Sequence, residues 1–346
     1  MIDTRLILLE GLPSTGKTTN AQFLQIQLER NGYKTKWIHE VTRPHPTSFF
    51  NEAGFTYLEF AKFADALNSV AVFRKNTVGI DLLEVEWNDL YDLKSLQEYD
   101  TWNFPHEKYK YFALDKWEHF AEEALRTDEI YIIDGSIFQF QIFSFLFENV
   151  PYIELESFVN KLFDIIRPLN PSLIYFYREN VEATIRYLEN DRGIQYLENM
   201  RERDKAWPYY QDKPTGAEGF KQFLRDYARF AELLFDSVSC KKVSIEISNA
   251  DWNRYENEML VFLEIKPLNG VYINEELNFE IKLDGLKIID PCGNERKLIP
   301  KSANEFYVEC LPTVLKFENA EQIVISGMQI LERWTTTGTV YKKGVI

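Results

Sequence analysis

Residues 5–19 of the 346-residue chain read RLILLEGLPSTGKTT, and this stretch decides the predicted fold. Its first half, up to Glu10, is an apolar run with the length of a buried β-strand. From Lys17 onward the apolar residues recur at helical spacing. The glycine-containing loop between the two halves, Gly11 to Thr18, fits the pattern G-x-x-x-x-G-K-[ST]. Pattern and context agree, because this motif requires a strand before it and a helix after it.

The loop predicts a site for the phosphates of a nucleoside triphosphate bound with Mg²⁺. Its glycines let successive main-chain N–H groups point inward, and the N-terminus of the following helix adds the positive end of its dipole. In such a site Lys17 bridges the β- and γ-phosphates, and the hydroxyl of Thr18 binds Mg²⁺. The residues expected to hold the nucleotide are Gly11, Pro13, Ser14, Thr15, Gly16, Lys17, Thr18 and Thr19.

The pattern that follows predicts an α/β fold. Short, mainly apolar runs at residues 129–133 and 171–177 predict further strands, as do the stretches 34–39 and 242–247. Segments of helical periodicity separate these predicted strands. This alternation is typical of a parallel sheet with helices on both faces. We therefore expect the three-layer α/β/α fold of P-loop nucleotide-binding proteins, with a mainly parallel sheet.

Two acidic residues follow predicted strands at the edge of the sheet where ligands bind. In parallel α/β sheets this edge is formed by the carboxyl ends of the strands. Asp134 directly follows the run at 129–133, and we expect it to hold Mg²⁺ or to accept a proton from an attacking hydroxyl. Its alternative role is to cap the next helix together with Ser136. Glu40 closes the run at 34–39 and is the expected general base.

Arginines are the candidates for binding negatively charged groups. Arg43, three residues after Glu40, would clamp the substrate or a phosphate, and its alternative is a solvated surface ion pair. The charged stretch 186–204 is a candidate lid in which Arg192 closes over the transferring phosphoryl group. The other arginines of this stretch are Arg186, Arg201 and Arg203. An exposed, salt-bridged helix is the alternative for the whole stretch.

Two further regions complete the predicted organisation. Residues 48–127 have mostly helical periodicity and many aromatic side chains, most of which belong to the core while a minority line an acceptor pocket. After Lys266-Pro267 the pattern changes to short β-type runs separated by turn residues. We therefore expect a kinase-like nucleotide-binding domain at 1–266 and a small all-β domain of unknown role at 267–346.

The charge balance disfavours several classes of partner. The chain has 39 Lys and Arg residues against 54 Asp and Glu, a formal net charge of −15 and a pI near 4.9. Nucleic acids and anionic membranes need a basic surface, so neither is an expected partner. No apolar run approaches the ~18 residues of a membrane span, and no signal peptide is recognisable. We expect a cytoplasmic protein, and a homodimer stays open.

The first 265 residues or so resemble the deoxynucleoside kinase and thymidylate kinase group of P-loop kinases. The stretch from Leu9 to Thr19 is similar to the opening of thymidylate kinases, and Glu40 to Pro44 resembles the acidic and Arg-Pro segment that ends their second strand. Residues 171–198 look like the fourth strand and arginine lid of deoxynucleoside kinases. One position departs from the pattern, because Asp134 is followed by Gly135-Ser136 and not by an arginine.

The resemblance implies ATP-dependent transfer of a γ-phosphoryl group to a hydroxyl or phosphate of a nucleoside or nucleoside monophosphate-like acceptor. The implied catalytic residues are Lys17, Glu40, Asp134 and Arg192, with Arg43 on the substrate, and the implied cofactors are ATP and Mg²⁺. The alternative is a nucleotide-dependent ATPase or switch whose C-terminal β domain binds a protein partner. A polynucleotide-end kinase is disfavoured by the net charge of −15. The identity of the acceptor and the preference for ATP over GTP stay open.

Overall fold

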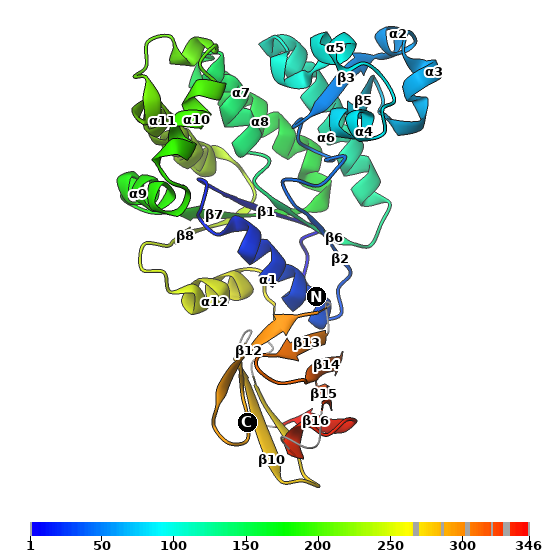
Figure 1. Cartoon of the computed structure of the whole chain (residues 1–346), viewed down its shortest axis with the longest axis vertical. Coiled ribbons are helices and arrows are strands. Elements are labelled where there is room, and N and C mark those ends of the chain that lie inside the picture. Colours follow the sequence, from blue (N-terminus) through cyan, green and yellow to red (C-terminus); the bar gives the residue numbers. More distant parts are fainter. Residues whose placement is uncertain are drawn as a thin grey trace. The chain divides into compact units, whose positions relative to one another are not determined.

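The structure of the chain is a computed structural model that describes residues 2–265, 270–284, 287–301, 305–319, 321–327 and 333–344. It contains two compact units, which we describe separately (Figure 1). The first, which we call the sheet unit, consists of residues 3–18 and 37–250. The second, the barrel unit, is formed mainly by residues 19–36 and the described residues from 251 onward. The predicted domain boundary at 266–267 lies outside the described residues.

The sheet unit is built on a five-stranded sheet with the order β2-β6-β1-β7-β8. Its strands are β1 (Leu6–Gly11), β2 (Thr35–Ile38), β6 (Ile130–Asp134), β7 (Pro171–Tyr177) and β8 (Lys241–Glu246). β1 pairs in parallel with β6 and β7, and β7 pairs in parallel with β8. The predicted fold class, a P-loop α/β fold with a mainly parallel sheet and a small C-terminal all-β domain, is confirmed.

β1 is the central strand, which explains why its sequence is apolar without alternation. Its residues Leu6 to Leu9 have no exposed surface, as expected for a parallel strand with neighbours on both sides. One large apolar cluster joins Leu6 and Leu8 to helices α6, α7, α8 and α11. These helices are α6 (His106–Leu125), α7 (Gln139–Phe147), α8 (Tyr152–Ile166) and α11 (Gly216–Ser237). Each buried Leu or Phe side chain contributes roughly 1.5–3 kcal/mol to the free energy of unfolding. This packing fixes the position of the strand ends.

Residues 52–81 correct the expectation of a helical region at 48–127. They form a small antiparallel sheet in the order β3-β5-β4, accompanied by short helices. The elements are β3 (Glu52–Thr56), α2 (Tyr57–Phe60), α3 (Ala64–Leu67), β4 (Ala71–Phe73), β5 (Thr77–Asp81), α4 (Leu82–Trp87) and α5 (Leu93–Leu96). The strands are too short to show alternation. Gly54 pairs with Gly79, and a Cβ on Gly54 would lie 2.8 Å from Thr101, so tertiary packing selects the sheet.

Two further helices of the sheet unit form the charged stretch that the sequence marks as a lid. They are α9 (Val181–Arg192) and α10 (Ile194–Arg203). Only Gly193 separates them, and its φ of +81° interrupts the helix with a conformation that glycine adopts readily.

Across the described ranges of the chain, no helix is both long enough and apolar enough to cross a lipid bilayer.

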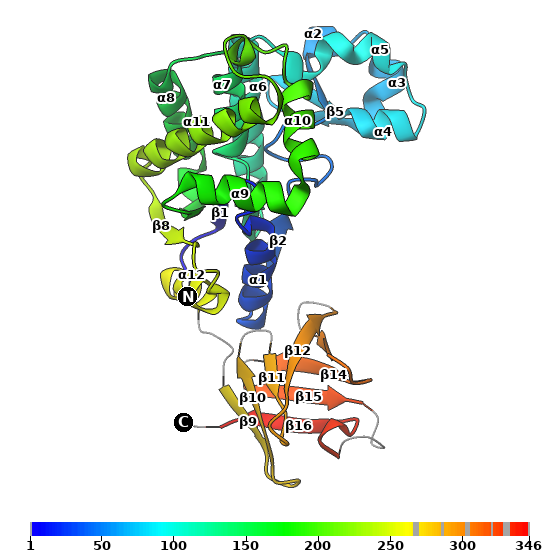
Figure 2. The same cartoon turned by 60° about the vertical axis from the view of Figure 1, so that its left-hand side comes forward.

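The described part of the barrel unit contains a closed eight-stranded antiparallel barrel (Figure 2), which confirms the small all-β domain that the β-type runs predict. The strands, in barrel order, are β10 (Phe279–Asp284), β11 (Lys287–Ile289), β12 (Glu295–Pro300), β13 (Glu305–Val308), β14 (Val314–Asn319), β15 (Gln322–Ser326), β16 (Thr339–Lys343) and β9 (Gly270–Asn274). β12 was not predicted, because it opens with the polar residues Glu295, Arg296 and Lys297. Inward-facing apolar residues, including Phe306 and Trp334, form the barrel core.

Helix α1 (Lys17–Arg30) belongs to the barrel unit from Thr19 onward, as does α12 (Trp252–Phe262). Ile26 is a member of the barrel's apolar cluster. One turn later, the guanidinium carbon of Arg30 lies 4.0 Å from the ring centroid of Phe306 and 4.3 Å from that of Phe317. The last turn of α1 is therefore part of the barrel core.

Candidate active site

The loop between β1 and α1 has the backbone of a phosphate-binding nest. Gly11 has a φ of +148°, and a Cβ at this position would lie 2.5 Å from a carbonyl oxygen of β7. Gly16 and Ser14 also have positive φ, at +87° and +59°. The hydroxyl of Thr15 donates to the carbonyl of Leu12 at 2.8 Å and closes the loop. Alternating backbone conformations of this kind turn successive N–H groups toward one centre, where an anion can bind.

Lys17 is the first residue of α1 and lies buried at the base of the loop. Its Nζ donates to the carbonyl oxygens of Gly11 and Leu12, at 2.9 and 3.0 Å. Burial lowers the pKa of this ammonium group, while nearby carboxylates, Glu40 and Asp134 among them, act in the opposite direction. A phosphate in the nest would offer this ammonium group better acceptors than the two carbonyls.

Thr18 and Asp134 bring a hydroxyl and a carboxylate together beside the loop. The Oγ1 of Thr18 donates to Oδ2 of Asp134 at 2.6 Å, and Nε1 of Trp37 donates to Oδ1 at 3.3 Å. Asp134 is buried at the end of β6, and burial raises its pKa. A hydroxyl and a buried carboxylate are the oxygen ligands that Mg²⁺ prefers. A divalent cation would also compensate the charge that is costly to bury here, so the two residues fit Mg²⁺.

The four predicted catalytic residues share one electrostatic environment. Burial lowers the pKa of Lys17 most, while the charges of Glu40 and Asp134 raise it and the charge of Arg192 lowers it. Glu40 in turn raises the pKa of Asp134, as expected for two carboxylates at one sheet edge. The structure therefore brings together residues that lie up to 175 positions apart in the chain, from Lys17 to Arg192. Their individual roles remain predictions.

Three other predicted residues lie at the margin of this centre. Pro13 is half-buried in the loop, and Thr19, the third residue of α1, is exposed. Arg43 points toward the small antiparallel sheet: its Nη1 donates to the carbonyl of Phe50 at 2.9 Å, and its Nε lies 3.8 Å from Oδ2 of Asp81. Because this guanidinium already has two partners, its predicted contact with substrate would require it to leave them.

Glu10 is a residue of the site that the sequence patterns missed. It is buried within β1, and its Oε1 accepts the main-chain N–H groups of Ser136 at 2.9 Å and Phe138 at 3.0 Å. Burial raises its pKa. The Ser136 hydroxyl also lies 2.7 Å from the Thr47 hydroxyl, which links this loop to the segment after β2. Glu10 thus positions the loop that follows Asp134, and its only sequence signal is an acid at the end of an apolar strand.

The end of α9 reaches the phosphate loop, as a lid should. Ser14 donates its hydroxyl to Oδ2 of Asp191 at 3.3 Å, and Arg192 is the next residue. The guanidinium of Arg192 lies 5.0 Å from the ring centroid of Tyr196 and is about half exposed. In contrast, Arg201 is buried and donates to the carbonyls of two residues outside its helix. Within the stretch 186–204, Arg192 therefore follows a residue that contacts the phosphate loop, whereas Arg201 has a structural role.

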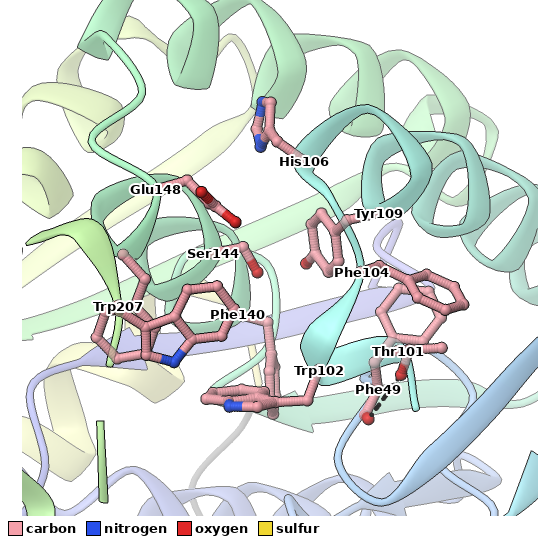
Figure 3. Close-up of a pocket in the computed structure, with 11 residues that line it drawn as sticks. Phe49, Thr101, Trp102, Phe104, His106, Tyr109, Phe140, Ser144, Glu148 and Trp207 are labelled. Atoms are coloured by element: carbon pink, nitrogen blue, oxygen red, sulfur yellow. Dashed lines mark hydrogen bonds between the residues drawn. The ribbon is translucent and has the colours of Figure 1, made fainter. Parts of the chain in front are cut away.

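Two cavities lie beside the aromatic residues of the region expected to bind the acceptor. The inner cavity has a volume of about 20 Å³, which is room for one water molecule (Figure 3). Figure 3 shows Trp102 and Trp207 at one end of it and His106 at the other. The outer cavity has a volume of about 550 Å³ and shares these two tryptophans. Only the outer cavity has the size of a small-molecule site.

Fold and loop together define an α/β fold with a P-loop between β1 and α1, followed along the chain by an antiparallel β-barrel. No family model and no curated protein sequence matches the chain. The solved structure of the Bacillus subtilis protein YorR in complex with phosphorylated GDP matches with a TM-score of 0.35 and 11% identity, over 75% of this chain and 95% of that chain. Candida albicans thymidylate kinase matches with a TM-score of 0.36 and 11% identity, over 76% of this chain and 92% of that chain. Likeness this distant carries no argument about what the chain binds.

Proposed function

We propose that the protein is an ATP-dependent small-molecule kinase. It transfers the γ-phosphoryl group of Mg²⁺–ATP to an acceptor of the nucleoside or nucleoside monophosphate type. The observation that carries the proposal is the phosphate nest with Lys17 at its base and the Thr18–Asp134 hydrogen bond beside it; the charges of Glu40 and Arg192 act on the same Lys17 ammonium group. Phosphoryl transfer needs this set, because its catalysis consists of positioning the reactants and stabilising negative charge.

Each residue has a defined task in this proposal. The loop N–H groups and Lys17 bind the phosphates, and Thr18 and Asp134 would hold Mg²⁺, which would supply positive charge to neutralise the phosphates. An acceptor oxygen forms a bond to the γ-phosphorus as the bond to the ADP oxygen breaks. Where that oxygen belongs to a hydroxyl, its proton passes to Glu40. Arg192 stabilises the equatorial oxygens from the lid side.

The charge balance supports a small acceptor over a polymer. A net charge of −15 repels polynucleotides, whereas a magnesium-bound nucleotide neutralises much of its own charge and binds in a local nest. The aromatic residues beside the outer cavity supply the kind of wall that small-molecule sites use. We therefore place the acceptor in the sheet unit, next to Trp102 and Trp207.

Calorimetry of Mg²⁺–ATP binding tests the nucleotide half of the proposal. Lys17→Met should weaken binding by about 30-fold, because charge-assisted hydrogen bonds to phosphate are lost. Lys205→Met is the matched control, since Lys205 is exposed and its ammonium group pairs with Glu202, three residues earlier in the chain. Phosphoryl transfer is then assayed with nucleosides, nucleoside monophosphates and hydroxylated antibiotics. Absence of any acceptor, together with equal binding by the Lys17→Met variant, would contradict the proposal.

One observation favours the alternative of a nucleotide-dependent switch. Helix α1 begins with Lys17 at the phosphate loop and ends with Arg30 in the core of the barrel unit. In this alternative, nucleotide binding changes the conformation of the first turn of this helix and thereby the affinity of the barrel for a protein partner. This alternative predicts slow ATP hydrolysis without any acceptor, and a co-purifying protein that is lost when residues 267–346 are removed.

A further inference from the structure

The outer cavity has a chemical character that narrows the class of acceptor. It is lined by residues from three segments of the sheet unit and by no residue of the phosphate loop. The lining residues are Phe50, Asn51, Asp100, Trp102, Asn103, Arg203, Ala206 and Trp207. Its volume of about 550 Å³ lies within the range of sites for drug-sized ligands. The following argument uses its rings, its polar groups and its charges in turn.

The two indoles favour stacking of a ligand ring on a single face. The ring centroids of Trp102 and Trp207 lie 6.4 Å apart, and their planes meet at 85°. A flat ring therefore cannot be enclosed between parallel indoles. Phe147 stacks on Trp207 at 5.5 Å and 18°, which occupies one face of this tryptophan. A ring that enters the cavity meets one indole face and leaves its own polar edge toward the remaining lining residues.

The polar side chains that line the outer cavity include both hydrogen-bond donors and hydrogen-bond acceptors. Within the described residues, the side-chain amide of Asn51 makes no hydrogen bond, so both its donor and its acceptor are available to a ligand. Asp100 accepts the main-chain N–H of Trp102 at 3.1 Å and the side-chain N–H of Asn103 at 3.5 Å, and its carboxylate keeps further lone pairs for a ligand. Hydroxyl groups can donate to and accept from such a set, because each of them does both.

The charges of the cavity disfavour an anion. Arg203 is the only cation among the described lining residues, and it is already neutralised: its Nε and Nη2 donate to the two carboxylate oxygens of Asp204, at 2.6 and 2.7 Å. Asp204 has 1% of its surface exposed, so a ligand does not reach it readily. The remaining charge is that of Asp100, whose pKa is raised by burial. A phosphate here would meet one carboxylate and no unpaired cation.

We infer that the outer cavity binds an uncharged, hydroxylated ring compound and that Asp204, by neutralising Arg203, excludes phosphorylated acceptors. That this compound is also the phosphoryl acceptor rests on the proposed function. Of the two kinds of acceptor named there, the inference favours a hydroxyl group over a phosphate. A nucleoside and a simple glycoside both have the required chemistry, since each presents a ring face and several hydroxyl groups.

Calorimetry on the full chain with two pairs of probes tests the inference. The pairs are thymidine with thymidine 5′-monophosphate, and methyl glucoside with glucose 6-phosphate. We expect the neutral member of at least one pair to bind about tenfold or more tightly than its phosphorylated partner. The pair that binds distinguishes a nucleoside from a glycoside. Tighter binding of the phosphorylated members overturns the inference.

Removing the negative charge beside Arg203 tests the role of Asp204. The Asp204→Asn variant keeps the shape of the side chain but releases the charge of Arg203, so the preference for the neutral probe should fall by about fivefold or more. Asp212→Asn is the matched control, because Asp212 is 78% exposed and pairs with Lys213. If circular dichroism shows that Asp204→Asn is unfolded, Arg203→Gln replaces it and should increase the preference. An unchanged preference in the folded variant contradicts the inference.

The outcomes separate this inference from the proposed function. If Mg²⁺–ATP binds and none of the four probes does at millimolar concentration, the inference fails while the nucleotide site stands. If a neutral probe binds with the expected preference and Mg²⁺–ATP does not bind, the cavity is assigned correctly and the kinase proposal fails.

Discussion

The hydroxyl of Thr18 donates to Oδ2 of Asp134 at 2.6 Å, which joins the first turn of α1 to the end of β6. The two residues are 116 positions apart: Asp134 is the last residue of β6, and Thr18 lies after the loop that follows β1, the parallel neighbour of β6. Parallel pairing therefore brings a hydroxyl and a carboxylate to one point without any local sequence relation. This point is where the phosphate nest and the strand ends meet, so its chemistry can be tested directly.

Asp134→Asn should uncouple nucleotide binding from magnesium. The amide keeps the shape and can still accept from Thr18, but it removes the charge that a divalent cation requires. Binding of Mg²⁺–ATP should weaken by about 10- to 100-fold, whereas ATP in excess EDTA should bind no worse than to the native chain. Titration calorimetry with and without magnesium measures both. Asp164→Asn, at an exposed site that pairs with Arg167, is the control.

The same effect of the Asp134→Asn substitution in both buffers would contradict a metal role for this residue. A role in capping the following helix, the alternative that the sequence left open, predicts that result together with a lower melting temperature. Because burial raises the pKa of Asp134, the native charge is unfavourable in the absence of a cation. A metal role therefore predicts a melting temperature that is unchanged or higher.

Arg192→Gln should reduce turnover more than nucleotide binding. Arg192 lies beside Asp191, which Ser14 of the phosphate loop contacts at 3.3 Å, and Gly193 follows it with a φ of +81°. An arginine that acts only on the transferring phosphoryl group contributes about 10²-fold or more to kcat and little to the KM for ATP. Arg186→Gln, one and a half turns earlier on α9, is the control. Equal losses from the two variants would make the lid assignment untenable.

The fold and the centre of the site could be predicted because their signals are local. The spacing from Gly11 to Thr18 and the apolar run before it define strand, nest and helix within fifteen residues. Asp134 ends an apolar run and Glu40 follows a predicted strand, and both could be assigned to one edge because parallel sheets collect strand ends there. No comparable signal reveals Glu10, since its function depends on the N–H groups of Ser136 and Phe138, far along the chain.

The small antiparallel sheet shows why the helical pattern expected at 48–127 failed over residues 52–81. Its stability depends on buried charges: Glu52 accepts from Arg74 at 2.7 Å and from Lys116, which α6 contributes. A Cβ on Gly79 would lie 2.4 Å from the Arg74 guanidinium, so this glycine is required for space. In a single sequence, charged residues predict an exposed surface and glycines predict a turn. Only the tertiary arrangement shows that these ones form an interior.

His45 should make the sheet unit sensitive to mild acid. It is 3% exposed, its Nδ1 accepts the main-chain N–H groups of Thr47 and Ser48, and burial, aided by Lys116 and Arg43, lowers its pKa to about 3. The unfolded chain binds a proton near pH 6.5 and the native chain does not, so stability falls as the pH drops from 6.5 toward 3.

The His45→Asn variant isolates this effect, because the asparagine Oδ1 can accept the same two N–H groups and does not titrate. Between pH 7 and pH 5 the native chain should lose about 2 kcal/mol of unfolding free energy through this residue. The variant should be less stable at pH 7 yet lose about 2 kcal/mol less over that interval. Guanidinium chloride unfolding at the two pH values gives the comparison. Parallel pH profiles for the two proteins would rule out His45 as the cause.

Arg30 should weaken the barrel unit in comparison with an uncharged residue of similar length. It is 6% exposed, and its Nε and Nη2 have no hydrogen-bond partner within the described residues. Burial lowers its pKa to about 9, so the guanidinium is charged at neutral pH at a cost to the folded state. The rings of Phe306 and Phe317, at 4.0 and 4.3 Å, compensate part of that cost.

Arg30→Met and Arg30→Ala separate charge from packing. Methionine fills the space between the two rings without a charge, so we expect the unfolding free energy to rise by about 1 kcal/mol. Alanine removes the packing as well and should lower it by about 1–3 kcal/mol relative to methionine. Hydrogen exchange in β13 and β14, which carry Phe306 and Phe317, reports the change where it arises. If the methionine variant exchanges faster than the native chain, the attraction of the rings for the cation outweighs its desolvation, and Arg30 stabilises the barrel.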